Sequence, residues 1–225
     1  MANSFAYQCI LMNRAISFES KLVLILLCMF SIFLSIFRVF ATDSSRYLFL
    51  NWNLFLAILP WLSIQWMKQR NPKSFVMISL IAFWLLFFPN SPYILTDLFH
   101  LQKSFGMPIW YDLIMIVSFA WTGLLFGFLS LMDLEEIVLQ RYPRIPFRMV
   151  IIVLFFITSF GVYLGRFLRW NSWDIIANPL HLFSDIFYRF ADPSAHLRTW
   201  GVTLLMGTML CLMYFSLKMF RNRTV

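Results

Sequence analysis

The sequence predicts an all-α integral membrane bundle of about six transmembrane helices, with two amphipathic helical loops at the outer leaflet. Hydrophobic residues make up 61% of the 225 residues and charged residues only 12%, whereas a soluble domain needs about 25% charged residues to cover its surface. Spans of roughly 20 residues each would use most of the chain and leave no room for a soluble domain of ordinary size. We therefore expect a single transmembrane domain over residues 1–225.

The expected spans are six apolar stretches separated by polar connections. The third stretch is short unless its helix continues past Pro89, and the other stretches are long enough to cross a bilayer unaided. The boundaries lie at residues 22–41, 47–67, 74–89, 109–131, 149–168 and 200–219.

Basic residues beside these stretches indicate the orientation. Eleven of the 18 Lys and Arg residues fall in the N-terminus, the 68–73 and 132–148 connections and the C-terminus, and the other seven lie on the opposite side. The positive-inside rule then places both termini in the cytoplasm. The net charge of +8 indicates contact with membrane lipids, and no nucleic acid is expected as a partner.

Two polar segments on the predicted outer side have the pattern of amphipathic helices. The first opens at Ser91, which can cap a helix whose first residue is proline, and places Asp97 and His100 on one face. The second opens at Asn178, also followed by proline, and ends at Asp192. We expect both to lie on the outer leaflet.

Asp97 and His100 are the candidate catalytic residues, because a spacing of three on a helix lets both side chains reach one point. They could form an acid–base pair in which the carboxylate orients the imidazole, or contribute to a metal site. They could also simply face lipid headgroups. The sequence shows no complete set of metal ligands at a recognisable spacing, so we assign no metal ligands and leave the cofactor unknown.

Arg166 and Arg169 lie one helical turn apart where the fifth span leaves the membrane. Such a pair can clamp a phosphate or carboxylate, or extend its guanidinium groups to lipid headgroups without a specific ligand. Asn171 and Asp174 follow as possible orienting partners. Asp112, at the start of the fourth span, could form an ion pair with either arginine or act as an acid.

The two polar segments leave the membrane on the same predicted side, and neighbouring helix ends lie roughly 8–10 Å apart. We therefore expect Asn90 or Asp97 to approach Arg166, Arg169 or Asn171, with Asp112 at the rim. Mutual neutralisation would lower the cost of holding charge at a membrane edge. The candidate ligand-binding residues are Asn90, Asp112, Arg166, Arg169, Asn171 and Asp174.

Three classes of function stay open. The leading one is an outward-facing site that binds or modifies an anionic lipid headgroup or a phosphate-bearing ligand. A small-solute permease or channel component is an alternative, although the middles of the spans carry no ionisable residue, which argues against ion- or proton-coupled transport. A membrane-complex assembly subunit or homo-oligomer is the third, supported by 27 phenylalanines and by the close-packing pairs Gly123/Gly127 and Gly161/Gly165.

The most distinctive motifs are Phe-Pro-Asn-Ser-Pro-Tyr-Ile-Leu-Thr-Asp-Leu at 88–98, Trp-Tyr-Asp at 110–112 and Gly-Arg-Phe-Leu-Arg-Trp-Asn-Ser-Trp-Asp at 165–174. From about residue 20 onward, the chain resembles an uncharacterised family of prokaryotic multi-pass membrane proteins, known as a domain of unknown function. The resemblance implies a bacterial-type cytoplasmic membrane and one membrane domain. It implies no activity, substrate or catalytic residue.

Overall fold

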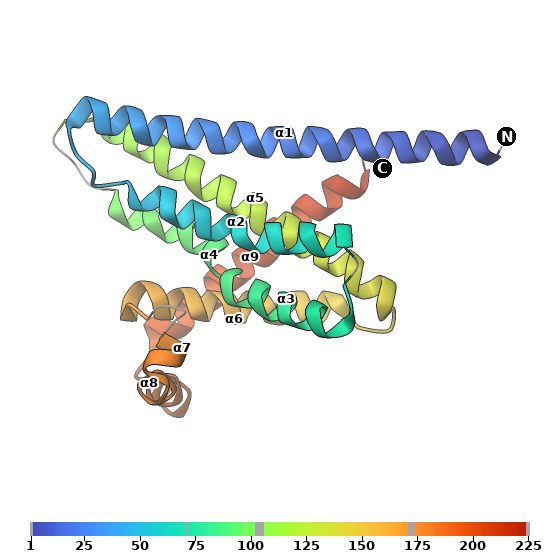
Figure 1. Ribbon diagram of the computed structural model, residues 1–225. Helices are drawn as coiled ribbons and strands as arrows, with labels where there is room; N and C mark the ends of the chain where they lie inside the picture. The colour runs from blue at the N-terminus through green and yellow to red at the C-terminus, as the bar shows by residue number, and fades with distance from the viewer. Residues whose placement is uncertain (1, 71, 102–105, 171–173, 224–225) are drawn as a thin grey trace.

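Long helices run between two ends of the molecule in the computed structural model (Figure 1). The structure describes residues 2–70, 72–101, 106–170 and 174–223, and these residues contain no strand. Both termini lie toward one end of the bundle, and the α1–α2 connection, α7 and α8 lie toward the other (Figure 1). The elements are α1 (Ala2–Thr42), α2 (Phe49–Arg70), α3 (Ser74–Phe87), α4 (Asn90–Tyr93), η1 (Ile94–His100, a 3₁₀ helix), α5 (Ile109–Arg141), α6 (Phe147–Leu168), α7 (Asp174–Ala177), α8 (Pro179–Ala191) and α9 (Leu197–Arg223).

The helical, multi-pass character of the chain is confirmed. Within the described residues, five helical stretches are long and apolar enough to cross a membrane, namely Lys21–Thr42, Ser74–His100, Ile109–Arg141, Phe147–Leu168 and Leu197–Arg221. The α2 helix is not among them, although its 22 residues run between the same two ends and pack against α5 (Figure 1). Polar residues of α2, including Asn51, Asn53 and Gln65, lower its hydropathy, and their side chains form hydrogen bonds inside the bundle.

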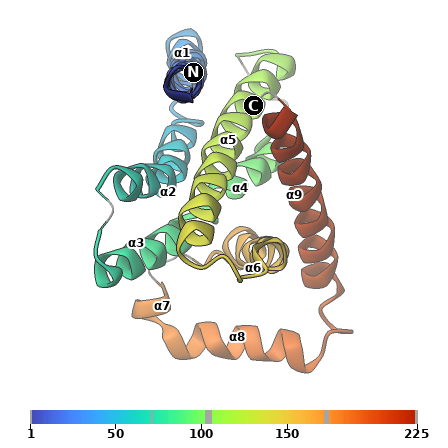
Figure 2. The same cartoon turned by 90° about the vertical axis from the view of Figure 1, so that its right-hand side faces the viewer.

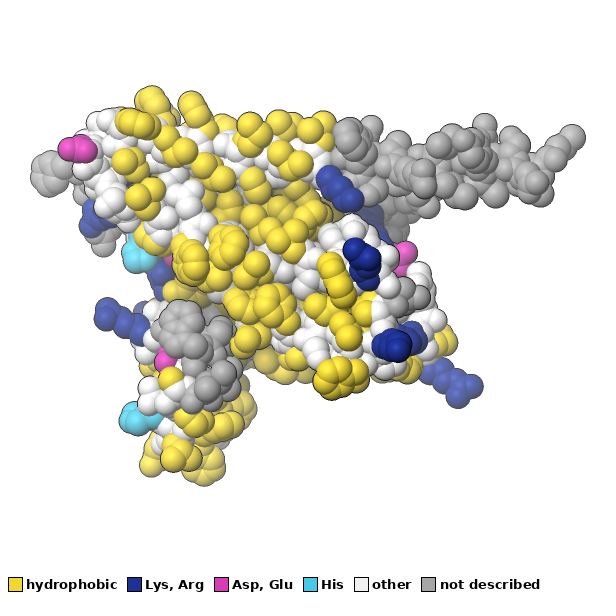
Figure 3. Space-filling model, in the orientation of Figure 1, with side chains coloured by type: hydrophobic (Ala, Val, Ile, Leu, Met, Phe, Trp, Pro, Cys, Tyr) yellow, Lys and Arg dark blue, Asp and Glu magenta, His cyan; other side chains and the backbone are white. Residues whose placement is uncertain are grey.

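Aromatic rings fill the centre of the bundle. Phe128 of α5, Phe155 of α6 and Tyr214 of α9 meet edge to face, with ring centroids 5.5 to 5.9 Å apart, and Phe88 lies 6.2 Å from Phe155. On the outer surface, hydrophobic side chains cover the middle of the face shown in Figure 3, while Lys and Arg gather toward its two ends. Such a surface is typical of a protein surrounded by lipid.

The third span continues helically past Pro89, which lengthens it as the short apolar stretch requires. Phe88 and Pro89 both have right-handed helical backbone angles, so α3 leads directly into α4. We expected Ser91 to cap a new helix, and this expectation is wrong. Ser91 is buried, and its hydroxyl donates to the carbonyl oxygen of Ala57 in α2 at 3.4 Å.

The first polar segment packs among the other helices and is largely buried, which corrects our expectation of an amphipathic helix at the surface. A Cβ atom on Gly123 would lie 2.6 Å from Ile94, and one on Gly127 would lie 2.6 Å from the Cβ atom of Ser91. These two glycines of α5 therefore create the space in which α4 and η1 pack. This Gly-x-x-x-Gly pair therefore allows close packing between helices of the same chain.

The second polar segment forms α8 as predicted, with Asn178 at its N-cap, proline at its first position and Asp192 after its last residue. This helix runs across the direction of the long helices at one end of the molecule (Figure 2). Several of its apolar side chains are exposed, namely Leu180, Phe183 and Phe187, whereas the partly exposed ring of Phe190 packs against Phe160 and Trp200. Contact of this face with the outer leaflet stays a prediction.

Candidate functional site

Asp97 of η1 and Arg166 of α6 form an ion pair that joins the two polar segments. Oδ1 of Asp97 lies 3.2 Å from Nη1 of Arg166, and Oδ2 accepts a hydrogen bond from Asn53 of α2 at 2.8 Å. The Asp97 residue is 0% exposed. The expected approach of Asp97 to Arg166 is therefore confirmed, and Asn53 is a third member that we did not anticipate.

Gly165 explains how α6 comes close enough for this pair. A Cβ atom at this position would lie 3.3 Å from the ring of Tyr93 and 3.3 Å from the carbonyl oxygen of Trp170. Without a side chain, the last turn of α6 can pack against α4, and Arg166 on the same turn reaches η1. The glycine and the arginine of this motif thus have complementary structural roles.

A second ion pair, between Arg38 of α1 and Asp112 of α5, is fully buried. Nε of Arg38 lies 2.6 Å from Oδ1 of Asp112, and Nη2 lies 3.2 Å from Oδ2. The side chains are 2% and 0% exposed, respectively. This corrects two expectations, because Asp112 is not at the rim of the site and its partner is neither Arg166 nor Arg169. An arginine inside the apolar stretch 22–41 was the sequence signal for this pair, since such a residue needs a carboxylate partner.

Tyr47, in the connection between α1 and α2, links the second ion pair to η1. The Arg38 guanidinium lies 4.4 Å from the centre of its ring, and its hydroxyl donates to the carbonyl oxygen of His100 at 3.0 Å. Burial raises the pKa of the Tyr47 hydroxyl, and the Asp112 carboxylate adds to this, against the opposite influence of Arg38 and Arg46. The hydroxyl therefore keeps its proton at neutral pH and remains a donor.

His100 is exposed, and its ring lies 5.1 Å from that of Phe49. Among the residues that the structure describes, no hydrogen bond joins it to Asp97, whose two oxygens face Arg166 and Asn53. This geometry favours Asp97 as a group that positions Arg166. A catalytic role for Asp97 and His100 stays a prediction.

The end of α6 carries a surface of two arginines and two phenylalanines, which we call the arginine–phenylalanine surface: Phe99, Arg166, Phe167 and Arg198. The Arg198 guanidinium lies 4.2 Å from the centre of the Phe167 ring, and that of Arg166 lies 5.8 Å from the centre of Phe99. The two rings are 6.1 Å apart. We did not anticipate Arg198, because only the packing of α9 against α6 brings it here.

We expected Arg169 to lie one helical turn above Arg166, and this expectation is wrong. The α6 helix ends at Leu168, and Arg169 adopts a left-handed conformation with φ of 61°. This conformation closes the helix, because the amide of Trp170 then donates to the carbonyl oxygen of Leu164 at 3.2 Å. The Arg169 side chain is exposed, three residues after Arg166 in the chain.

The other candidate residues have more local surroundings. Asn90 is partly buried and donates to the carbonyl oxygen of Phe87 at 2.9 Å, so it stabilises the α3–α4 junction. Asp174 is half-buried at the start of α7. Asn171 lies outside the described residues. Across the described part of the chain, no three His, Cys, Asp or Glu side chains are grouped closely enough to hold a metal ion.

Comparison with known proteins gives one finding. A family model described as "Protein of unknown function (DUF1361)" matches residues 52–213. The match includes both polar segments and begins after α1, later than the resemblance noted from about residue 20. No curated protein and no solved structure matches the chain.

Proposed function

We propose that this chain, which belongs to the DUF1361 family of proteins of unknown function, binds the phosphate-bearing headgroup of an anionic lipid at the arginine–phenylalanine surface. The observation that carries the proposal is the fixed position of Arg166. One carboxylate, that of buried Asp97, holds its guanidinium through Nη1 at the edge of an otherwise apolar bundle. Its side chain is still 12% exposed, so other donors of the planar fork can reach a ligand.

The charge balance around this surface favours an anion. Asp97 compensates Arg166, whereas Arg169 and Arg198 are exposed and have no carboxylate within 4.0 Å among the described residues. These two cations therefore leave the region positive. Guanidinium groups bind phosphate through two parallel hydrogen bonds, which an ammonium group cannot do.

The two phenylalanines suit a lipid better than a free ion. Phe99 is 64% exposed, and its neighbour Phe167 carries Arg198 on its face. Stacking on an aromatic ring restrains an arginine before any ligand arrives, which reduces the entropy lost on binding. The rings also offer an apolar surface for glycerol and the first methylene groups of an acyl chain.

The protein beneath the site is packed. Ile94 and Phe119 are fully buried, and Phe88 is 1% exposed. We expect this arrangement of a surface binding site, whereas a permease needs a path that continues toward the middle of the membrane. The orientation of the site toward the outside of a cell membrane is part of the proposal and follows from the distribution of Lys and Arg.

The test uses the full chain purified in mild detergent, with native mass spectrometry to compare retention of phosphatidylglycerol and phosphatidylcholine. We expect the wild type to retain phosphatidylglycerol preferentially and Arg198→Met to reduce this preference about tenfold, which corresponds to about 1.4 kcal/mol. Arg148→Met is the matched control, because Arg148 also stacks on a phenylalanine, Phe215, at 5.4 Å but at the other end of the bundle. An equal loss in both variants would show a general charge effect and contradict the proposal.

A further inference from the structure

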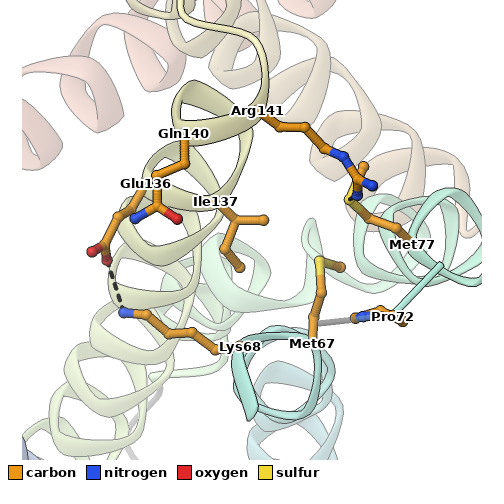
Figure 4. Close-up of a pocket in the computed structure, with 8 residues that line it drawn as sticks. All are labelled: Met67, Lys68, Pro72, Met77, Glu136, Ile137, Gln140 and Arg141. Carbon is orange, nitrogen blue, oxygen red and sulfur yellow. Dashed lines mark hydrogen bonds and ion pairs between the residues drawn. The ribbon is translucent and has the colours of Figure 1, made fainter. Parts of the chain in front are cut away.

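A pocket of about 440 Å³ lies at the end of the bundle opposite the arginine–phenylalanine surface. Residues from the end of α2, the start of α3 and the last two turns of α5 surround it (Figure 4). This volume lies in the range of sites that hold small molecules, about 300–1,000 Å³. Nothing in the proposed headgroup site uses these residues.

One part of the pocket wall is apolar. Met67, Met77 and Ile137 supply it, and both methionines are almost fully buried. Methionine side chains are flexible and polarisable, so they adapt to apolar ligands of different shapes. This part of the wall can receive glycerol carbons or a short stretch of hydrocarbon.

The charged part of the wall is unevenly compensated. Nζ of Lys68 lies 2.9 Å from Asp133 and 2.8 Å from Glu136, so its charge is matched. Arg141 instead directs Nη1 to the sulfur of Met77 at 3.3 Å, and a thioether is a weak acceptor. Within the described part of the chain, no carboxylate lies within 4.0 Å of Arg141. Figure 4 shows Arg141 and Met77 on one side of the space and the Lys68–Glu136 pair on the other.

We infer that this pocket binds a phosphate ester with a single anionic head, whose phosphate pairs with Arg141 and whose carbon chain lies against Met67, Met77 and Ile137. Among the described residues, the guanidinium of Arg141 is the one cation of the pocket without a carboxylate partner. A phosphate would give its N–H donors strong acceptors in place of the Met77 thioether. Glu136 on the opposite wall would repel a second anionic group, so a polyphosphate is disfavoured. A lipid from the adjacent leaflet and a soluble phosphate ester share this chemistry.

The test uses the full chain in nanodiscs of phosphatidylcholine and three probes: dihexanoyl phosphatidic acid, glycerol 3-phosphate and inorganic phosphate. All variants carry Arg198→Met, so that the weakened headgroup site makes the same small contribution to every binding curve measured by isothermal titration calorimetry. We expect Arg141→Met to weaken binding of dihexanoyl phosphatidic acid at least about tenfold, or about 1.4 kcal/mol. Arg141→Lys, which keeps the charge but loses the fork, should lie between Arg141→Met and the wild-type residue.

Arg144→Met is the matched control, because it removes the same charge three residues later from an exposed position outside the pocket. We expect its effect to be small. Tighter binding of dihexanoyl phosphatidic acid than of glycerol 3-phosphate identifies a lipid, and equal binding identifies a soluble phosphate ester. Equal losses in Arg141→Met and Arg144→Met, or no binding of any probe, would overturn the inference and leave the headgroup proposal untouched.

Discussion

Nη1 of Arg166 lies 3.2 Å from Oδ1 of Asp97, although 69 residues separate them in the chain. The contact joins η1 to the end of α6, and Asn53 extends it to α2. A buried carboxylate without a cation is costly, so the pair constrains where these three elements can lie. It also restrains the arginine that we propose as a headgroup ligand.

Removing the cation of this pair should destabilise the fold. We expect Arg166→Met to lower the free energy of unfolding by about 3–5 kcal/mol, because Asp97 would remain buried with Asn53 as its polar partner. Adding Asp97→Asn should restore part of the loss, since the amide carries no charge to compensate. Unfolding by denaturant in mild detergent measures both effects. Arg169→Met is the control, with an expected change in the free energy of unfolding within about 0.5 kcal/mol. Additive effects of Arg166→Met and Asp97→Asn would contradict the pairing.

The buried Arg38–Asp112 pair should respond differently to single and double replacement. Arg38→Met or Asp112→Leu alone removes one charge of a buried pair and should cost about 3–5 kcal/mol, whereas the double variant replaces both charges by apolar groups and should be more stable than either single variant. Thermal unfolding of the three purified variants in one detergent tests this order. A double variant less stable than both single variants would show that the pair contributes more than mutual neutralisation.

Replacement by alanine should change the free energy of unfolding differently at two glycines of similar sequence context, Gly127 and Gly161. In Gly127→Ala, the new Cβ atom would lie 2.6 Å from the Cβ atom of Ser91, so α4 must shift at a cost of about 1–3 kcal/mol. Gly161 has no neighbouring atom within 4 Å of an added Cβ, and alanine favours a helix by up to about 1 kcal/mol over glycine. Measured free energies of unfolding should therefore fall for the first variant and stay equal or rise for the second. Similar losses at both positions would contradict the packing described here.

Periodicity and composition predicted much of this fold, because they report on single helices. The apolar stretches and the boundaries of α8 follow from local patterns, whereas the new helix expected to begin at Ser91 was wrong. The meeting of Asp97 and Arg166 was also predictable, since both lie near the ends of spans that the sequence predicts to emerge on one side. In each case the relevant signal lies within one segment or at its end.

Features that depend on which helices lie side by side were not predictable in this way. Arg38 looked like one more basic residue near a membrane boundary, and its pairing with Asp112 depends on α1 packing against α5. Arg198 reaches Phe167 through the contact of α9 with α6. The burial of η1 depends on the shape of α5 at Gly123, where a missing side chain gives no polarity signal. Helix pairing is a property of shape complementarity, which one sequence expresses only weakly.

The last prediction concerns α2, whose polar residues keep it out of the set of apolar spans although it runs between the two ends of the bundle. If α2 crosses the membrane, Ser45 before it and Gln69 near its end face opposite compartments, and both are exposed.

The test replaces the native cysteines Cys9, Cys28 and Cys211 by serine and introduces single cysteines at Ser45, Gln69, Tyr142 and Ser194. None of these four replacements alters the basic residues on which the orientation depends. A membrane-impermeant maleimide added to intact cells should label positions 45 and 194, and should label 69 and 142 only after permeabilisation. Labelling of 45 and 69 from the same side would show that α2 does not cross, and reversal of all four positions would contradict the orientation.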